Sequence, residues 1–288
     1  MEKKGRKSNY DKDLPITLDN IPFFMKGQLR TMLGLTASIR LGLTAFTLVG
    51  KTNEERHFAL NKRFMVRVPD DCTTLEEAIA TVDEYSNLTT IVLMKGYHRM
   101  GNYSLSIPST MNIVGDPNVQ KHDIMVDGSF FIDENVQGHF HLQNMKIRRG
   151  HWAGVVVESS VVTMEDVVVE FCARGIYVTS TGIVRCTNVE LLRGDIGIEV
   201  EEGGSITLVG PDMKVHDNDV GLNLYGTPPV QLVSPLTKEK VFYNNKETYP
   251  SFQSLQPSFQ SLQRTYIQII EEDTSSGESK KNLHLRLL

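Results

Sequence analysis

Asparagine and aspartate recur along the chain at a nearly constant spacing, the first pattern that could support chemistry. The steps are 22, 22 and 24 residues, and the positions are Asn144, Asp166, Asn188 and Asp212. Stacked carboxylates could supply the acid and base of a glycoside-cleaving enzyme. The same residue types also tolerate the left-handed backbone of a sharp corner, where their side chains bond nearby backbone groups. We therefore interpret the series as corners of a repeating structure rather than as a catalytic array.

Two histidine-containing segments could contribute metal ligands. The densest polar cluster, His-Asp-Asn-Asp at 216–219, immediately precedes a predicted glycine corner, where polar turn residues are expected. His139 and His141 share one face of a predicted strand, but no third ligand lies at a metal-binding spacing. We expect neither a metal ion nor a cofactor.

Basic and aromatic residues indicate a binding site more strongly than a catalytic one. The segment 148–152, Arg-Arg-Gly-His-Trp, joins two cations to the only tryptophan, which is typical of a hot spot for an acidic peptide or a phosphate. A basic turn with a packed tryptophan is the alternative. Outward positions after successive glycines form a mixed aromatic and polar column of Val156, Tyr177, Glu199 and Asn223. The predicted binding residues are Arg148, Arg149, Trp152, Tyr177, Glu199 and Asn223.

A repeat of about 22 residues must position these side chains. Arg-Gly-Ile-Tyr-Val at 174–178 returns as Ile-Gly-Ile-Glu-Val at 196–200, 22 residues later. Such a short unit cannot bury its apolar face alone, but it can do so by coiling, with each strand pairing with its equivalent one turn on. Two predicted inward columns are Met145, Val167, Val189, Met213 and Ile147, Val169, Leu191, Val215. We predict an all-β protein, a right-handed parallel β-helix of seven or eight turns over residues 64–245.

Other segments surround the predicted coil. Thr74-Leu-Glu-Glu77 has the spacing of a capping box and predicts one short amphipathic helix after the first strand. Residues 1–13 are predicted to be a disordered basic tail, and 14–63 a helical N-terminal segment that caps the coil. Residues 246–288, which contain PSFQSLQ twice, are predicted to be a low-complexity disordered tail, in which 266–270 could add a strand.

Composition excludes several function classes. Residues 1–67 carry 13 Lys and Arg against 6 Asp and Glu, a balance of +7, whereas 68–288 carry 17 against 29, a balance of −12. An acidic surface repels phosphate, so we expect no nucleic-acid partner. Three cysteines at unrelated spacings indicate no disulfide framework. The longest apolar run, 41–50, is only ten residues and is too short to span a bilayer. A cytoplasmic or nuclear setting is expected, with no membrane partner.

Residues 66–245 resemble the right-handed parallel β-helix, or pectin-lyase-like, superfamily. Lys95-Gly96-Tyr97 and Val114-Gly115-Asp116 are similar to the first turns of pectin methylesterases. The Gly-Tyr-Gln-Asp-Thr-Leu and Asp-Phe-Ile-Phe-Gly elements of those esterases are absent, as are the Asn-Thr-Asp, Gly-His-Gly and Arg-Ile-Lys elements of polygalacturonases. The resemblance therefore implies the fold without the chemistry.

Residues 14–43 faintly resemble an F-box, with Leu14-Pro15 at the start, but Pro22 and the lack of a late tryptophan depart from that pattern. The preferred function is a non-catalytic scaffold whose side wall binds a protein or a glycan. A carbohydrate-active enzyme and an F-box-like ubiquitin-ligase adaptor are the alternatives.

Overall fold

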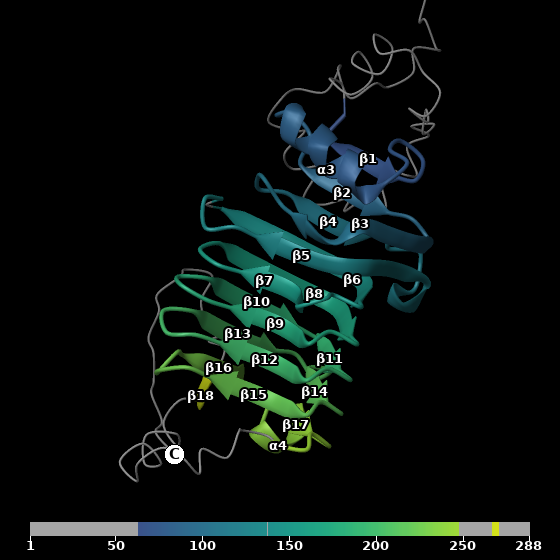
Figure 1. The fold of residues 1–288 in the computed structure, drawn as a ribbon. Coiled ribbons are helices and arrows are strands. Elements are labelled where there is room, and N and C mark those ends of the chain that lie inside the picture. The colour runs from purple at the N-terminus through teal and green to yellow at the C-terminus, as the bar shows by residue number, and fades with distance from the viewer. Residues whose placement is uncertain (1–62, 137, 248–266, 271–288) are drawn as a thin grey trace, which may run out of the picture. The chain divides into compact units, whose positions relative to one another are not determined.

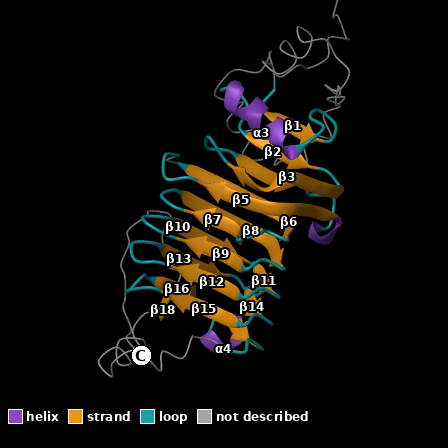
Figure 2. Cartoon of the chain, in the orientation of Figure 1, coloured by secondary structure: helices purple, strands orange, loops and turns teal. Residues whose placement is uncertain are grey.

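The computed structural model describes residues 63–136, 138–247 and 267–270. The strands within these ranges form one continuous system in which every pairing is parallel, and the chain coils through about eight turns (Figure 1). Each strand pairs with its equivalent one turn later; for example, Arg185 aligns with Thr163 before it and Thr207 after it. The predicted all-β parallel solenoid is thus confirmed, with strands dominating and few helices (Figure 2).

The coil has three walls, which we call sides A, B and C. Side A comprises β1 (Met65–Val68), β2 (Thr90–Leu93), β4 (Asn112–Gly115), the first parts of β6 (His139–Arg148) and β8 (Val161–Glu170), β10 (Ile183–Thr187), β13 (Ser205–Val209), β16 (Val230–Val233) and β18 (Ile267–Ile270). Side B comprises the first parts of β3 (Gly96–Ser106) and β5 (Ile124–Ile132), the second parts of β6 and β8, β11 (Glu190–Leu192), β14 (Lys214–His216) and β17 (Phe242–Tyr243). Side C comprises the second parts of β3 and β5, β7 (Ala153–Val157), β9 (Arg174–Val178), β12 (Ile196–Val200) and β15 (Val220–Leu224).

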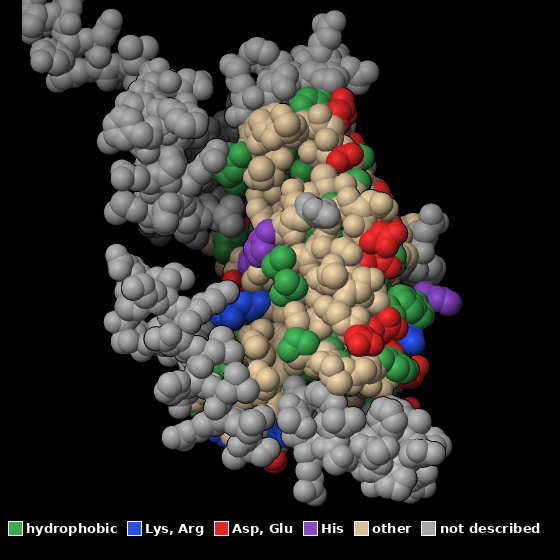
Figure 3. Space-filling view, turned by 90° about the vertical axis from the view of Figure 1, so that its left-hand side faces the viewer, with side chains coloured by type: hydrophobic (Ala, Val, Ile, Leu, Met, Phe, Trp, Pro, Cys, Tyr) green, Lys and Arg blue, Asp and Glu red, His purple; other side chains and the backbone are tan. Residues whose placement is uncertain are grey.

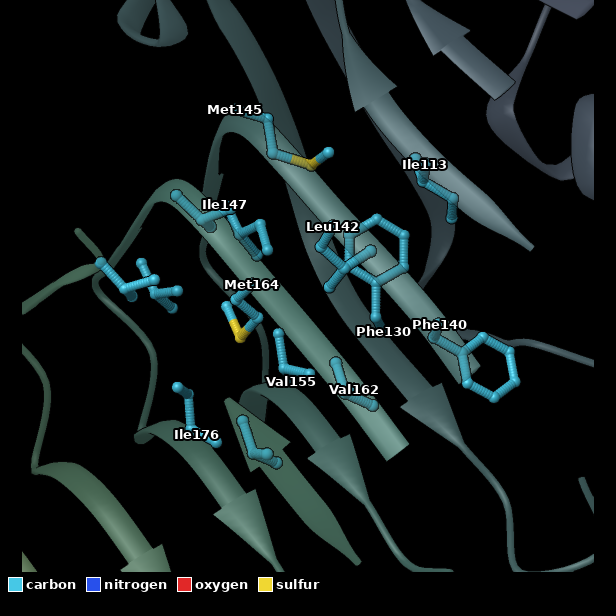
Figure 4. Close-up of a cluster of buried hydrophobic side chains, with 14 of the residues drawn as sticks. Ile113, Phe130, Phe140, Leu142, Met145, Ile147, Val155, Val162, Met164 and Ile176 are labelled. Atoms are coloured by element: carbon cyan, nitrogen blue, oxygen red, sulfur yellow. The ribbon is translucent and has the colours of Figure 1, made fainter. Parts of the chain in front are cut away.

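The core lies inside the coil and is built from columns of equivalent residues. Both predicted columns exist, because Met145 aligns with Val167 and Leu191 aligns with both Val169 and Val215. All eight side chains of these columns are at most 1% exposed. Figure 4 shows apolar side chains of neighbouring turns gathered inside the coil, with Phe130 and Val155 on adjacent strands. Burying each such side chain contributes about 1.5–3 kcal/mol, which drives the coiling that one repeat alone could not sustain.

The corner between sides A and B contains the predicted Asx residues. Asn144, Asp166 and Asn188 adopt left-handed backbone, with φ of 54°, 52° and 54°. Asn144 donates from Nδ2 to the carbonyls of residues 116 and 119 in the preceding turn, at 2.9 and 3.0 Å. The fourth turn differs, because its left-handed residue is Gly210 (φ 87°) and the Asp212 N–H instead donates to Oδ1 of Asn188. These residues therefore form corners that also join successive turns.

A helix covers the start of the coil. Helix α3 (Leu75–Glu84) follows β1 on side A and leads to β2 on the same side, so it replaces sides B and C in the first turn. The predicted N-cap is confirmed, since Thr74 Oγ1 accepts the Glu77 N–H at 3.1 Å, while the Glu77 carboxylate accepts the N–H of residue 73. The apolar face of α3 is buried against the strands beneath it.

Two further short helices lie in the turns: η2 (Lys121–Asp123) and α4 (Lys238–Val241). Strand β18 lies inside the range predicted to be a tail, and it pairs in parallel with β16. The predicted basic tail and helical cap, and both copies of PSFQSLQ, lie outside the described residues. Within the described ranges, no helix has the length and apolarity that a membrane crossing requires.

Candidate functional site

The side C column predicted from the repeat exists. The register aligns Val156 with Tyr177, Tyr177 with Glu199, and Glu199 with Asn223, so four consecutive turns contribute one residue each. Adjacent strands are about 4.8 Å apart, which brings these side chains into direct contact range. The preceding glycines permit this close stacking: a Cβ at Gly175 would lie 2.4 Å from the carbonyl oxygen of Gly197. The glycine repeat is therefore required by packing between turns.

An arginine that the sequence analysis did not select lies at the centre of this wall. The guanidinium carbon of Arg174 lies 4.9 Å from the ring centroid of Trp152 and 5.6 Å from that of Tyr177. The two rings meet edge to face, with centroids 4.8 Å apart and an interplanar angle of 74°. Cation–π attraction and edge-to-face packing both restrict the rotamers of these side chains. Trp152 remains 44% exposed, so part of its surface faces solvent.

A buried carboxylate holds this arginine. Glu199 is only 2% exposed, and its Oε2 pairs with Nε of Arg174. Its other oxygen, Oε1, accepts a hydrogen bond from Nδ2 of Asn223 at 3.1 Å. A buried charge is tolerated only when it is paired and hydrogen-bonded, and both conditions are met here. We call Trp152, Arg174, Tyr177, Glu199, Glu201 and Asn223 the side C cluster.

A second carboxylate completes the side C cluster. Glu201 accepts hydrogen bonds from Thr179 Oγ1 at 2.7 Å and from the Tyr177 hydroxyl at 2.5 Å. The bond from Thr179, followed by that from Tyr177, lowers the pKa of Glu201 below its usual value. Burial and the bond to Glu201 raise the pKa of Tyr177 to about 12. At neutral pH the site therefore presents an ionised carboxylate and a protonated phenol.

Of the other two predicted binding residues, Arg148 ends strand β6 on side B, and Arg149 follows it at the corner between sides B and C. Arg148 Nε lies 3.5 Å from Oδ1 of Asp127, which is itself buried, and Arg149 NH1 lies 4.0 Å from Oδ2 of the same residue. Asp127 Oδ2 also accepts a 2.5 Å hydrogen bond from the Tyr97 hydroxyl. The structure thus separates the predicted set: four residues join the side C cluster, whereas Arg148 on side B and Arg149 at the B–C corner meet the carboxylate of Asp127.

The segments considered for metal binding have other contacts. Both ring nitrogens of His216 meet carboxylates, Nδ1 with Asp217 at 2.7 Å and Nε2 with Glu190 at 3.0 Å, and the ring stacks on Tyr243. Asn218 is buried and bonds backbone groups of its own and the preceding turn. In the part of the chain that is described, no group of three or more His, Cys, Asp or Glu has an arrangement suited to a metal ion.

Cys72, Cys172 and Cys186 are all buried, and the last two lie in the repeat. Burial raises the pKa of the Cys172 thiol to about 11, although the Gly150 N–H donates to its sulfur. Burial also raises the pKa of Cys186 far above its usual value. Thiols with raised pKa values are poor nucleophiles, so neither residue provides a reactive centre.

Comparison of the chain with protein-family models, with curated proteins and with solved structures finds no match. The class that the coordinates define is a parallel β-solenoid with a conformationally restrained cluster of aromatic and charged side chains on one wall. Any assignment of function to this chain must therefore come from its own geometry.

Proposed function

We propose that the protein is a non-catalytic β-solenoid scaffold whose side C binds a protein or a glycan. The observation that carries the proposal is the side C cluster itself. Its ion pair, hydrogen bonds and ring contacts connect four successive turns through Arg174, Tyr177 and Glu199. A surface whose rotamers are already restricted loses little entropy on binding, which is the main advantage of preorganisation.

Two exposed aromatic rings on side C suit recognition. Trp152 of the side C cluster is 44% exposed, and Tyr225, which lies outside the cluster and follows β15, is 49% exposed. Tryptophan and tyrosine supply large contact areas with few rotatable bonds, and they are enriched where proteins bind partners. Their rings can also stack on the apolar face of a sugar, and the Glu201 carboxylate, which is not fully buried, lies beside Tyr177 as a hydrogen-bond acceptor.

Two features favour binding over cleavage. Hydrolysis of a glycosidic bond needs one carboxylic acid that is protonated at working pH. Glu201 is held ionised by its two hydroxyl donors, and Glu199 is buried against Arg174.

Membership of the pectin-lyase-like superfamily is part of the proposal, supported by the parallel coil and by the resemblance at Lys95-Gly96-Tyr97.

The test compares two substitutions that each remove exposed apolar surface. Trp152→Ala changes side C, and Ile183→Ala, at a residue 47% exposed on side A, is the control. Each protein is used for affinity purification from source-cell lysate and for a glycan array, and each is assayed for polyuronate cleavage. A protein or glycan retained by wild type and the control but lost with Trp152→Ala supports the proposal. Equal retention by both variants, or polyuronate cleavage that Glu199→Gln abolishes, would overturn it.

A further inference from the structure

The corner between sides B and C contains large side chains where the backbone is left-handed. Arg149, Phe171 and Arg193 occupy equivalent positions in three successive turns, with φ of 57°, 55° and 57°. We call these three residues the corner column. Left-handed backbone is unfavourable for a large L-residue, and asparagine, aspartate or glycine is the usual occupant.

The same molecule uses those usual residues elsewhere. The A–B corner of the same turns has Asn144, Asp166 and Asn188 in left-handed backbone. The next two turns of the B–C corner also revert to Asx, with Asp217 at φ 54° and Asn244 at φ 52°. Backbone strain of this kind concentrates at functional positions, so the corner column is a candidate for a function that compensates its cost.

The corner column presents unfilled hydrogen-bonding capacity. The side chains of Arg149 and Arg193 are 60% and 55% exposed, and Phe171 between them is 50% exposed. The arginines lie 4.0 and 3.8 Å from Asp127 and Glu170, beyond hydrogen-bond distance. Within the described ranges, neither guanidinium makes a hydrogen bond, and both side chains are more than half exposed.

The ion pairs that Asp127 and Glu170 make beside this corner contain more cations than carboxylates: four cations share these two buried carboxylates. The acidic residues of the same corner, Asp195 and Asp217, follow Arg193 in the chain. The four cations are Lys146, Arg148, Arg149 and Arg193. By contrast, the turns from side C to side A carry Glu134, Glu158, Glu201 and Glu202, and acidic side chains gather on that side of the coil (Figure 3). An anionic partner is therefore directed to the B–C corner.

We propose that the corner column binds an extended acidic peptide with the pattern acidic–x–apolar–x–acidic. Arg149 and Arg193 are two turns apart, about 9.6 Å at the usual strand spacing. Acidic residues four apart in an extended peptide are separated by roughly 13 Å, a difference that two long arginine side chains can accommodate. The apolar residue between them packs on Phe171, over which Arg193 lies at 5.5 Å. A guanidinium group binds a carboxylate through two parallel hydrogen bonds, and this geometry selects a partner with acidic side chains.

This inference rests on the proposed scaffold function and names the partner chemistry for the corner that adjoins side C. The probe is a fluorescein-labelled peptide containing Glu-Ala-Leu-Ala-Glu, titrated with the full chain by fluorescence anisotropy at low and physiological salt. Companion peptides replace both glutamates with glutamine, or leucine with serine. We expect affinity to fall with salt and to fall about tenfold with the glutamine peptide, because charge-assisted hydrogen bonds are lost.

Asparagine substitutions separate binding from folding. Arg149→Asn, Phe171→Asn and Arg193→Asn each place a residue that tolerates left-handed backbone, so we expect the melting temperature to stay constant or rise. Affinity for the glutamate peptide should nevertheless fall about tenfold with each arginine variant. Lys95→Gln removes a cation from an exposed pair elsewhere and should leave affinity unchanged. A purely structural role would leave affinity unchanged in every asparagine variant.

Several results overturn the inference. These are no saturable binding of the glutamate peptide, equal binding of the glutamine peptide, or unchanged affinity in the asparagine variants. Preference for a single-stranded oligonucleotide over the peptide would also overturn it. Trp152→Ala distinguishes the two proposals: if it abolishes capture of a partner while the corner variants do not, the scaffold function stands and the acidic-peptide assignment fails.

Discussion

Replacing Arg174 with methionine should destabilise the protein mainly through the carboxylate it leaves behind. Glu199 is 2% exposed, and among the described residues the Asn223 amide is the hydrogen-bond partner that remains after the change. Removing one member of a buried ion pair typically costs about 3–5 kcal/mol. Because the Arg174 side chain is 26% exposed and the Asn223 bond survives, we expect the low end, about 3 kcal/mol.

The double variant Arg174→Met with Glu199→Gln tests this reasoning. It removes the buried charge while retaining an acceptor for Asn223, so about 2 kcal/mol should be recovered relative to Arg174→Met alone. Urea unfolding followed by far-UV circular dichroism measures all four corners of the mutant cycle. If the double variant is as unstable as Arg174→Met, lost packing against Trp152 is the cause, and the argument from buried charge is refuted.

Three further predictions concern residues near the two corners and the side C cluster. Asn218→Ala should cost about 2 kcal/mol in urea unfolding, since it leaves the Gly194 N–H without its acceptor; a loss below about 0.5 kcal/mol would mean that water replaces the amide. The lowered pKa of Glu201 stabilises the folded state above the ordinary glutamate pKa, and this contribution is lost as pH falls through the folded pKa. Glu201→Gln should therefore reduce stability at pH 7 and have less effect at acidic pH, and a pH-independent difference between melting temperatures would contradict this. Cys172, with its pKa raised to about 11, should react with a thiol reagent at pH 8 only after unfolding; rapid labelling of the native protein would refute its burial.

The fold could be predicted from the repeat, because strand pairing in a parallel coil itself requires a nearly constant period in the sequence. A parallel coil requires each strand to meet its equivalent, so residues one period apart must share a column. The repeat therefore predicts that Met145 aligns with Val167 and Tyr177 with Glu199, and the register of the strands confirms both pairs. The left-handed Asx corner and the cap at Thr74 followed from equally local preferences.

The candidate sites were predicted only in part, since they depend on contacts between side chains. Arg174 lay at a known repeat position, but its role depends on the Trp152 ring and the Glu199 carboxylate, which come from other turns. The closeness of Arg148 and Trp152 in sequence predicts a single site, yet the corner between them directs them to different walls. Phe171 and Arg193 carried no turn signal, because large residues rarely adopt left-handed backbone.

The sequence by itself determined the period, the inward columns and the alternation of strand and corner, since these follow from local backbone preference and apolar burial. Only the tertiary structure decided which charges are buried as pairs and which remain open to solvent. That distinction is physical: a carboxylate such as Glu199 is compensated by a cation one turn away, whereas the guanidiniums of Arg149 and Arg193 lie too far from their carboxylates to bond them.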